Sequence, residues 1–134
     1  MDKRKESRMV KNKLEVSPLG KTWLLDLDGT IVKHNGYLID GRDSLLPGAK
    51  EFFDGISEED KVIILTARGS EYREMTESFL TEAGIRFDII LYDMPHGERV
   101  LINDKKASGL KTAIAVNTER DQFCQMKFVV NEEL

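Results

Sequence analysis

The stretch that decides the fold runs from Lys21 to Thr30 and reads KTWLLDLDGT. Its apolar middle contains one acid, Asp26, and the stretch turns polar at Asp28 and Gly29. A short apolar run that ends in a polar, glycine-containing segment is typical of a buried strand that leads into a loop. We therefore predict a strand that delivers Asp26 and Asp28 to its carboxyl end.

Four further apolar runs have the length of strands, at residues 62–65, 87–92, 100–102 and 113–116. Helical spacing of apolar residues follows Pro47 and Ser70, and Gly84 supplies a stop for the second helix. This alternation predicts an α/β fold, a Rossmann-like parallel sheet with helices on both faces. Counted with Lys21–Leu27 as the first, the third run (87–92) and the fourth (100–102) are separated by only seven residues, whereas a parallel crossover needs about a dozen. Either the third run is short and peripheral, or that link is an extended crossing without a helix.

The dipeptide Asn35-Gly36 lies between two short apolar runs and tolerates the positive φ of a two-residue hairpin turn. We therefore predict a small β-hairpin flap over residues 31–40. Only 33 residues separate Asp28 from Val62, and the flap and one helix consume them. The sequence thus leaves no room there for a large cap domain.

The composition is that of one globular domain, with 134 residues, 40% hydrophobic and 33% charged. No apolar run approaches the roughly 20 residues that span a bilayer, so we expect no membrane segment. The single cysteine, Cys124, excludes an internal disulfide and favours a reducing, cytoplasmic compartment.

Charge is uneven along the chain. Residues 1–18 hold six Lys/Arg against three Asp/Glu, while the whole chain carries a net charge of -4. We interpret residues 1–18 as a basic, flexible N-terminal arm or an oligomer contact, and residues 19–134 as a single domain. The acidic balance gives no broad attraction to nucleic acid. The tail, residues 121–134, could form a last strand over 126–130 or a helix.

Polar side chains follow three of the predicted strands: Asp26 and Asp28, then Thr66 and Arg68, then Asn103 and Asp104. The carboxyl ends of parallel strands meet at one edge of a sheet, where ligands bind. Two close carboxylates repel each other unless a cation compensates, and oxygen donors of this kind suit Mg²⁺. We therefore predict a magnesium site at this edge of the sheet.

The segment Asp26–Thr30 resembles the first motif of the haloacid dehalogenase-like superfamily of phosphohydrolases. Thr66 and the pair Asn103-Asp104 resemble its second and fourth motifs, so the resemblance extends over residues ~21–117. It implies that Asp26 is the nucleophile that forms an aspartyl-phosphate. It also implies that Asp28 is the general acid and base and lends its backbone carbonyl to the metal. By the same resemblance, the other metal ligands are Asp26, Asp104 and, through its amide oxygen, Asn103.

The resemblance places the phosphate at Gly29 and at the segment Thr66, Ala67 and Arg68. Gly29 lets the chain turn beside the phosphate, Thr66 donates a hydrogen bond to it, and Arg68 can hold it bidentately. A Thr-x-Arg arrangement also recurs in the polynucleotide phosphatase branch of the superfamily.

This sequence differs most from the superfamily at the third motif, because Met94 stands where a lysine is expected. Arg99 precedes the predicted fourth strand and so lies at its wrong end. Lys105 and Lys106 follow that strand, and we expect one of them, with Arg68, to neutralise the phosphoryl oxygens.

These observations predict a magnesium-dependent phosphomonoester hydrolase that acts on a sugar phosphate or a similar small phosphorylated metabolite. One alternative is a nucleotide or nucleic-acid-end phosphatase, favoured by Thr66 and Arg68. Another, from a different class, is a non-catalytic phosphate-binding or scaffold domain, suggested by Met94 and Asn103. An open site is also compatible with gating by a neighbouring subunit in a homo-oligomer.

Overall fold

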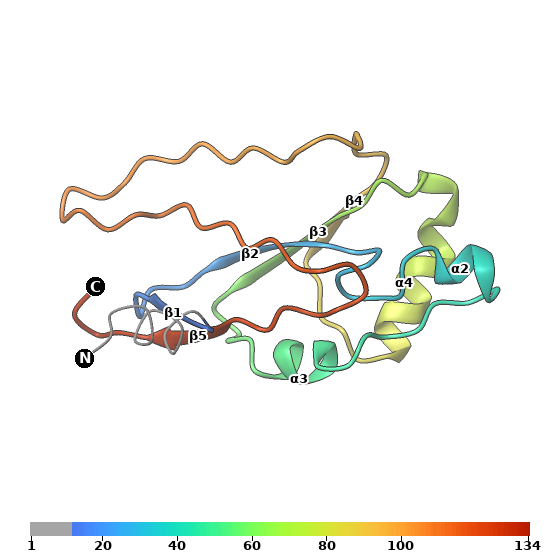
Figure 1. The fold of residues 1–134 in the computed structure, drawn as a ribbon, viewed down its shortest axis with the longest axis horizontal. Helices are drawn as coiled ribbons and strands as arrows, with labels where there is room; N and C mark the ends of the chain where they lie inside the picture. The colour runs from blue at the N-terminus through green and yellow to red at the C-terminus, as the bar shows by residue number, and fades with distance from the viewer. Residues whose placement is uncertain (1–11) are drawn as a thin grey trace. The chain divides into compact units, whose positions relative to one another are not determined.

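The computed structural model describes residues 12–134 and divides them into two compact units (Figure 1). One unit comprises Gly20–Gly97 and Thr118–Cys124 and carries the main sheet. The other comprises the described residues up to Leu19, together with Glu98–Asn117 and Gln125–Leu134. This division differs from the single domain that we expected over residues 19–134, and we describe each unit by itself.

The main sheet has three parallel strands in the order β2-β3-β4 (Figure 1). These are β2 (Thr22–Asp26), β3 (Lys61–Leu65) and β4 (Ile89–Leu91). β2 and β4 lie inside predicted apolar runs, and β3 begins one residue before the predicted run 62–65. The register pairs Asp26 with Leu65, so β2 and β3 end together. The α/β class with a parallel, Rossmann-like sheet is thereby confirmed. β4 is short and forms an edge, which agrees with the first of the two interpretations of the third run.

Two helices connect these strands as the apolar spacing predicted. The helix α3 (Ala49–Asp54) follows Pro47, and the turn η1 (Ser70–Tyr72) leads into α4 (Arg73–Glu82). Gly84 adopts a φ of 75° and donates its N–H to the C=O of Thr81, which ends α4. Within the described chain, no helix is long and apolar enough to cross a membrane.

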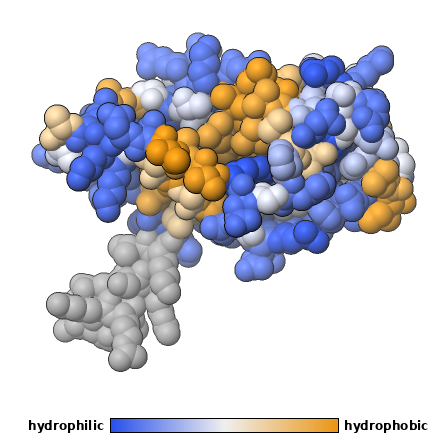
Figure 2. Space-filling model, turned by 90° about the horizontal axis from the view of Figure 1, so that it is seen from above, coloured by the Kyte–Doolittle hydropathy of each residue, from blue (hydrophilic) through white to orange (hydrophobic). Residues whose placement is uncertain are grey.

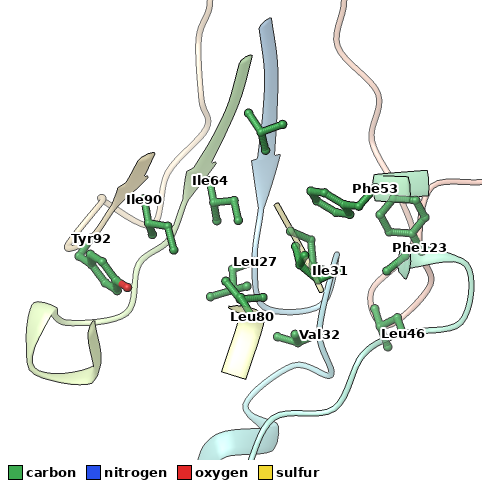
Figure 3. Close-up of a cluster of buried hydrophobic side chains, with 13 residues drawn as sticks. Leu27, Ile31, Val32, Leu46, Phe53, Ile64, Leu80, Ile90, Tyr92 and Phe123 are labelled. Carbon is green, nitrogen blue, oxygen red and sulfur yellow. The ribbon is translucent and has the colours of Figure 1, made fainter. Parts of the chain in front are cut away.

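Both helices pack on the same face of the sheet, where the prediction had helices on both faces. Phe53 from α3 and Leu80 from α4 join one core with Ile64 of β3 (Figure 3). Strands that are neighbours in both sequence and sheet, joined by right-handed crossovers, place their connecting helices on one side. The opposite face keeps large apolar side chains exposed, and Figure 2 shows patches of such side chains at the surface. They include Leu24, Ile89 and Leu91.

The predicted hairpin over residues 31–40 is wrong. Asn35 does adopt a positive φ of 55°, but it precedes a single helical turn, α2 (Gly36–Ile39). The backbone of the preceding residues pairs elsewhere, because Val32 bridges Leu45 in antiparallel fashion and the N–H of Leu46 donates to the C=O of Ile31 at 2.9 Å. Val32 is completely buried, so core packing directs the pairing toward residues 44–46.

In the other unit, β1 (Lys13–Val16) and β5 (Lys127–Val130) form a two-stranded parallel sheet. Part of the arm that we expected to be flexible is therefore a strand, while residues 1–11 lie outside the described residues. β5 also decides the ambiguity of the tail in favour of the strand.

The apolar runs 100–102 and 113–116 form no strand in the structure, contrary to the prediction. Val100 is 79% exposed and Ile102 is 90% exposed. An apolar run becomes a strand only where a neighbouring backbone pairs with it and its side chains are buried. Neither condition is met for these residues in the unit that contains them.

Candidate active site

The loop after β2 is closed by its own backbone. The C=O of Leu27 accepts the N–H groups of Ile31 at 2.9 Å and Val32 at 3.2 Å, and the N–H of Gly29 donates back to Val32 at 2.7 Å. Gly29 has a φ of 81°, a conformation that other residues rarely adopt. Leu27 and Ile31 are almost completely buried and anchor the loop in the core (Figure 3). The residues of this loop, Asp26–Thr30, therefore have defined positions.

Asp26 is the last residue of β2 and lies at the carboxyl edge of the sheet. Its Oδ2 accepts a hydrogen bond from the hydroxyl of Thr30 at 3.2 Å. Thr30 therefore orients the carboxylate that the family resemblance implies as the nucleophile.

Asp28 is held by the guanidinium of Arg68. Nε of Arg68 donates to Oδ2 of Asp28 at 3.0 Å, and Nη2 donates to Oδ1 at 2.9 Å. The Arg68 side chain is 1% exposed and that of Asp28 is 17% exposed. This bidentate ion pair at the end of β3 fixes the plane of the Asp28 carboxylate.

Arg68 makes a second bidentate ion pair, with the buried Asp43. Its Nη1 and Nη2 donate to the two oxygens of Asp43 at 3.0 and 2.6 Å, and Nη1 also donates to the hydroxyl of Thr76 at 2.9 Å. An arginine has five N–H donors, and all five are used here. The structure thus leaves Arg68 no donor for the phosphate that the sequence analysis assigned to it.

Burial and the neighbouring carboxylates act in opposite directions on the pKa of Arg68. Burial lowers the pKa of Arg68, but the hydrogen bonds to Asp43 and Asp28 outweigh it, so its pKa is raised above the ordinary value. The ring of Tyr37 covers the guanidinium with its centroid 3.9 Å from Cζ. Burial, followed by the charge of Asp28, raises the pKa of the Tyr37 phenol. The arginine therefore stays charged and the tyrosine neutral around Asp28.

Thr66 follows β3 and is 1% exposed. Its Oγ1 accepts the backbone N–H of Arg68 at 3.0 Å, which leaves the hydroxyl hydrogen free to be donated to an acceptor. Ala67 is partly exposed between them. Of the predicted phosphate-binding segment, Thr66 thus keeps a suitable donor.

The other predicted site residues, Asn103, Asp104, Lys105 and Lys106, belong to the other unit and are exposed there. Nδ2 of Asn103 donates to the hydroxyl of Thr112 at 2.8 Å, and that hydroxyl donates to the C=O of Asp104. The N–H of Lys106 donates to the C=O of Leu110 at 2.9 Å in a turn. These contacts order a surface loop by local hydrogen bonds.

Among the described residues, no group of three or more His, Cys, Asp or Glu side chains could hold a metal ion. The loop after β2 supplies two donors of the type that Mg²⁺ takes, the carboxylate of Asp26 and the backbone carbonyl of Asp28. The carboxylate of Asp28 is already paired with Arg68. The Asp26 carboxylate and the Asp28 backbone carbonyl would therefore be the ligands by which this loop holds a magnesium ion.

Sequence reasoning missed Asp43, Tyr37 and Thr76. They lie 25, 31 and 8 positions from Arg68 in the sequence and meet it only in the folded chain. No periodicity connects them, and an aspartate in a loop, such as Asp43, is usually a solvated surface residue. The sequence offered one indication of a partner, because a charged residue such as Arg68 that follows a buried strand needs an opposite charge when it is buried.

No protein-family model and no curated protein matches this chain. Chains of solved structures are similar to it, including two from structures of the Pnkp1/Rnl/Hen1 complex. A chain of the Pnkp1/Rnl/Hen1 RNA repair complex is 31% identical, with a TM-score of 0.49, over 63% of this chain and 29% of that chain. A chain of a second structure of the Pnkp1/Rnl/Hen1 complex is 30% identical, with a TM-score of 0.49, over 63% of this chain and 32% of that chain. The chain spans less than a third of the length of either.

Proposed function

We propose that this protein is a magnesium-dependent phosphomonoester hydrolase of the haloacid dehalogenase-like type. The observation that supports the proposal is the loop Asp26–Thr30, where two aspartates at the end of a parallel strand are each held by a partner of their own. A binding module has no use for two oriented carboxylates of like charge at one strand end. A hydrolase needs both, one as a nucleophile and one as an acid and base.

In the proposed reaction, a carboxylate oxygen of Asp26 attacks phosphorus and the bond to the leaving oxygen breaks. Asp28 takes up a proton from solvent and passes it to the leaving oxygen, and the products are an aspartyl-phosphate and an alcohol. Asp28 then takes a proton from water, which attacks phosphorus and releases inorganic phosphate and Asp26. The Asp26 carboxylate and the Asp28 carbonyl would hold a magnesium ion, whose positive charge would offset that of the phosphoryl oxygens.

Arg68 has a positioning role in this proposal. Its two bidentate pairs hold the Asp28 carboxylate in one orientation, and Asp43 and Thr76 hold Arg68 in turn. General acid and base catalysis depends on this geometry. Of the predicted phosphate-binding segment, the Thr66 hydroxyl would still donate a hydrogen bond to a phosphoryl oxygen.

The substrate class that we propose is a sugar phosphate or a similar small phosphorylated metabolite. Between β2 and β3, α2 contributes only the four residues Gly36–Ile39 as a cover. The Thr66-Ala67-Arg68 arrangement had favoured a nucleic-acid end, and the occupied donors of Arg68 remove that support.

Phosphate release from a panel of esters tests the proposal. The panel contains sugar phosphates, nucleotides and an oligonucleotide with a terminal phosphate, each with magnesium and with excess EDTA. We expect magnesium-dependent release from the sugar phosphates, absent in Asp26→Asn. Release that survives in Asp26→Asn, or no release from any ester, would overturn the proposal. Preference for the oligonucleotide would keep the hydrolase and replace its substrate.

A further inference from the structure

The segment Thr118–Cys124 lies against the loop Asp26–Thr30, although it is far away in the sequence. The N–H of Asp121 donates to the C=O of Gly29 at 2.9 Å, and Oδ1 of Asp121 accepts the N–H of His34 at 2.7 Å. Asp121 has a φ of 64°, so the chain turns at this contact. Two hydrogen bonds to backbone groups of the loop region therefore hold this segment in place.

Phe123 anchors the same segment in the core. It is 4% exposed, and its ring packs against that of Phe52 with centroids 5.2 Å apart. Figure 3 shows Phe123 beside Phe53 and Leu46. Because backbone hydrogen bonds and a buried ring fix Asp121 and Phe123, the position of the preceding Arg120 is determined by the fold.

Arg120 lies directly beside Gly29. Its Cγ is 3.3 Å from the point where a Cβ on Gly29 would lie, and Nδ1 of His34 is 3.7 Å from the same point. Arg120 is exposed, and within the described part of the chain no carboxylate pairs with its guanidinium. The neighbouring Asp121 carboxylate is bound through one oxygen to the backbone of His34. Arg120 thus brings a positive charge to the loop that no ion pair of this unit uses.

The loop needs such a charge if it binds a phosphate. Asp26, Asp28 and Asp43 carry three negative charges around one positive charge, that of Arg68. The excess negative charge repels a phosphomonoester dianion. Arg68 cannot offset it, because its donors are occupied. The proposed magnesium ion would balance the carboxylates, which leaves the charge of the phosphate dianion itself, and Arg120 is placed beside the loop to offset it.

We propose that Arg120 binds the phosphoryl group of a phosphomonoester at the Asp26–Thr30 loop, with His34 as a neighbouring donor. The proposal rests on the proposed function for its substrate class, a phosphomonoester with a free dianionic phosphate. A guanidinium donates two parallel hydrogen bonds to phosphate oxygens, and these charge-assisted bonds are stronger than neutral ones. Gly29 has no side chain, which lets Arg120 lie this close to the turn.

Direct binding of inorganic phosphate to the full chain tests this site. Isothermal titration calorimetry in the presence of magnesium compares the wild type with Arg120→Ala, Arg120→Lys and Lys61→Ala. Lys61→Ala removes the same charge from the start of β3, the opposite end of the strand from the site. We expect Arg120→Ala to raise the Kd for phosphate roughly ten- to hundredfold and Arg120→Lys to raise it less. Lys61→Ala should leave it within twofold, and melting temperatures should show that all variants are folded.

Steady-state kinetics on the best ester separates the two proposals. Arg120→Ala should raise KM with a smaller change in kcat, which a general loss of structure would not do. Unchanged phosphate affinity in Arg120→Ala, or no phosphate binding by the wild type, would overturn the Arg120 site. If the wild type binds phosphate through Arg120 but hydrolyses no ester, the proposed hydrolase fails and the anion site stands. If esters are hydrolysed and Arg120→Ala changes neither KM nor phosphate affinity, the proposed hydrolase stands and the Arg120 site fails.

Discussion

The loops at residues 26–30 and 103–106 begin from the same sequence pattern, an apolar run followed by acidic and polar side chains. At the first, the run is a strand paired with β3, and Arg68 reaches the loop from the end of that strand. At the second, residues 100–102 form no strand and Asp104 is exposed. The comparison teaches that a strand-end acid becomes an oriented group only where a second strand brings it a buried partner.

The largest expected effect comes from the acid of the first loop. Asp26→Asn should reduce phosphate release below detection, because an amide is not a nucleophile of comparable strength and no aspartyl-phosphate can form. The matched control is Asp54→Asn, an exposed aspartate of α3 that pairs with Lys50. Turnover of Asp26→Asn within tenfold of the wild type, measured by phosphate release, would remove Asp26 as the nucleophile.

Removal of a cation from each of the two loops should change the free energy of unfolding by very different amounts. Arg68→Ala leaves Asp28 and the buried Asp43 without their partner, and removal of one side of such a pair costs about 3–5 kcal/mol. Lys106→Ala removes an exposed charge and should stay within about 0.5 kcal/mol. Urea denaturation measures both.

Arg68→Lys sharpens this comparison, since one ammonium cannot replace two bidentate pairs. We expect it to fall between the wild type and Arg68→Ala. Equal stabilities of Arg68→Ala and Lys106→Ala would mean that the buried network does not hold the first loop.

Magnesium should stabilise the protein by binding its folded form. At a magnesium concentration one hundred times the Kd, linkage predicts about 2.7 kcal/mol of added stability. Asp26→Asn should lose most of the corresponding rise in melting temperature, because it replaces a charged ligand on the loop. A rise of the same size in Asp26→Asn would place the ion away from this loop.

The smallest expected effect concerns Tyr92, which follows β4 at the edge of the main sheet. Burial, and then the hydrogen bond to Glu77, raise the pKa of Tyr92 to about 12 from the ordinary value of 10.0. The folded state therefore holds the phenolic proton more tightly, so this stabilisation is complete below pH 10 and is lost as the pH rises toward 12.

Tyr92→Phe should consequently reduce the decline in unfolding free energy over this pH interval. Urea denaturation between pH 9 and 12 measures the decline. An identical decline in both proteins would show that Tyr92 does not contribute to it.

Much of the main unit could be predicted from the sequence because its signals are local. The apolar run before Asp28 and the apolar run before Thr66 each became a strand, and Pro47 and Gly84 lie at helix ends as expected. The hairpin at Asn35 failed for a physical reason. The dipeptide specifies a backbone conformation, which Asn35 does adopt, but the burial of Val32 decides which backbone pairs with it.

The parallel α/β class and the place of Asp26 and Asp28 at the end of one strand follow from the order of residues alone, since hydrophobic periodicity and strand length depend on neighbouring residues. The partners of these acids depend on how the chain folds. Arg68 pairs with Asp28 across 40 positions, and the segment that carries Arg120 bonds to the loop across about ninety. Such contacts leave no periodic trace in the chain, because a buried ion pair is specified by where two elements meet in space and not by the spacing of its residues.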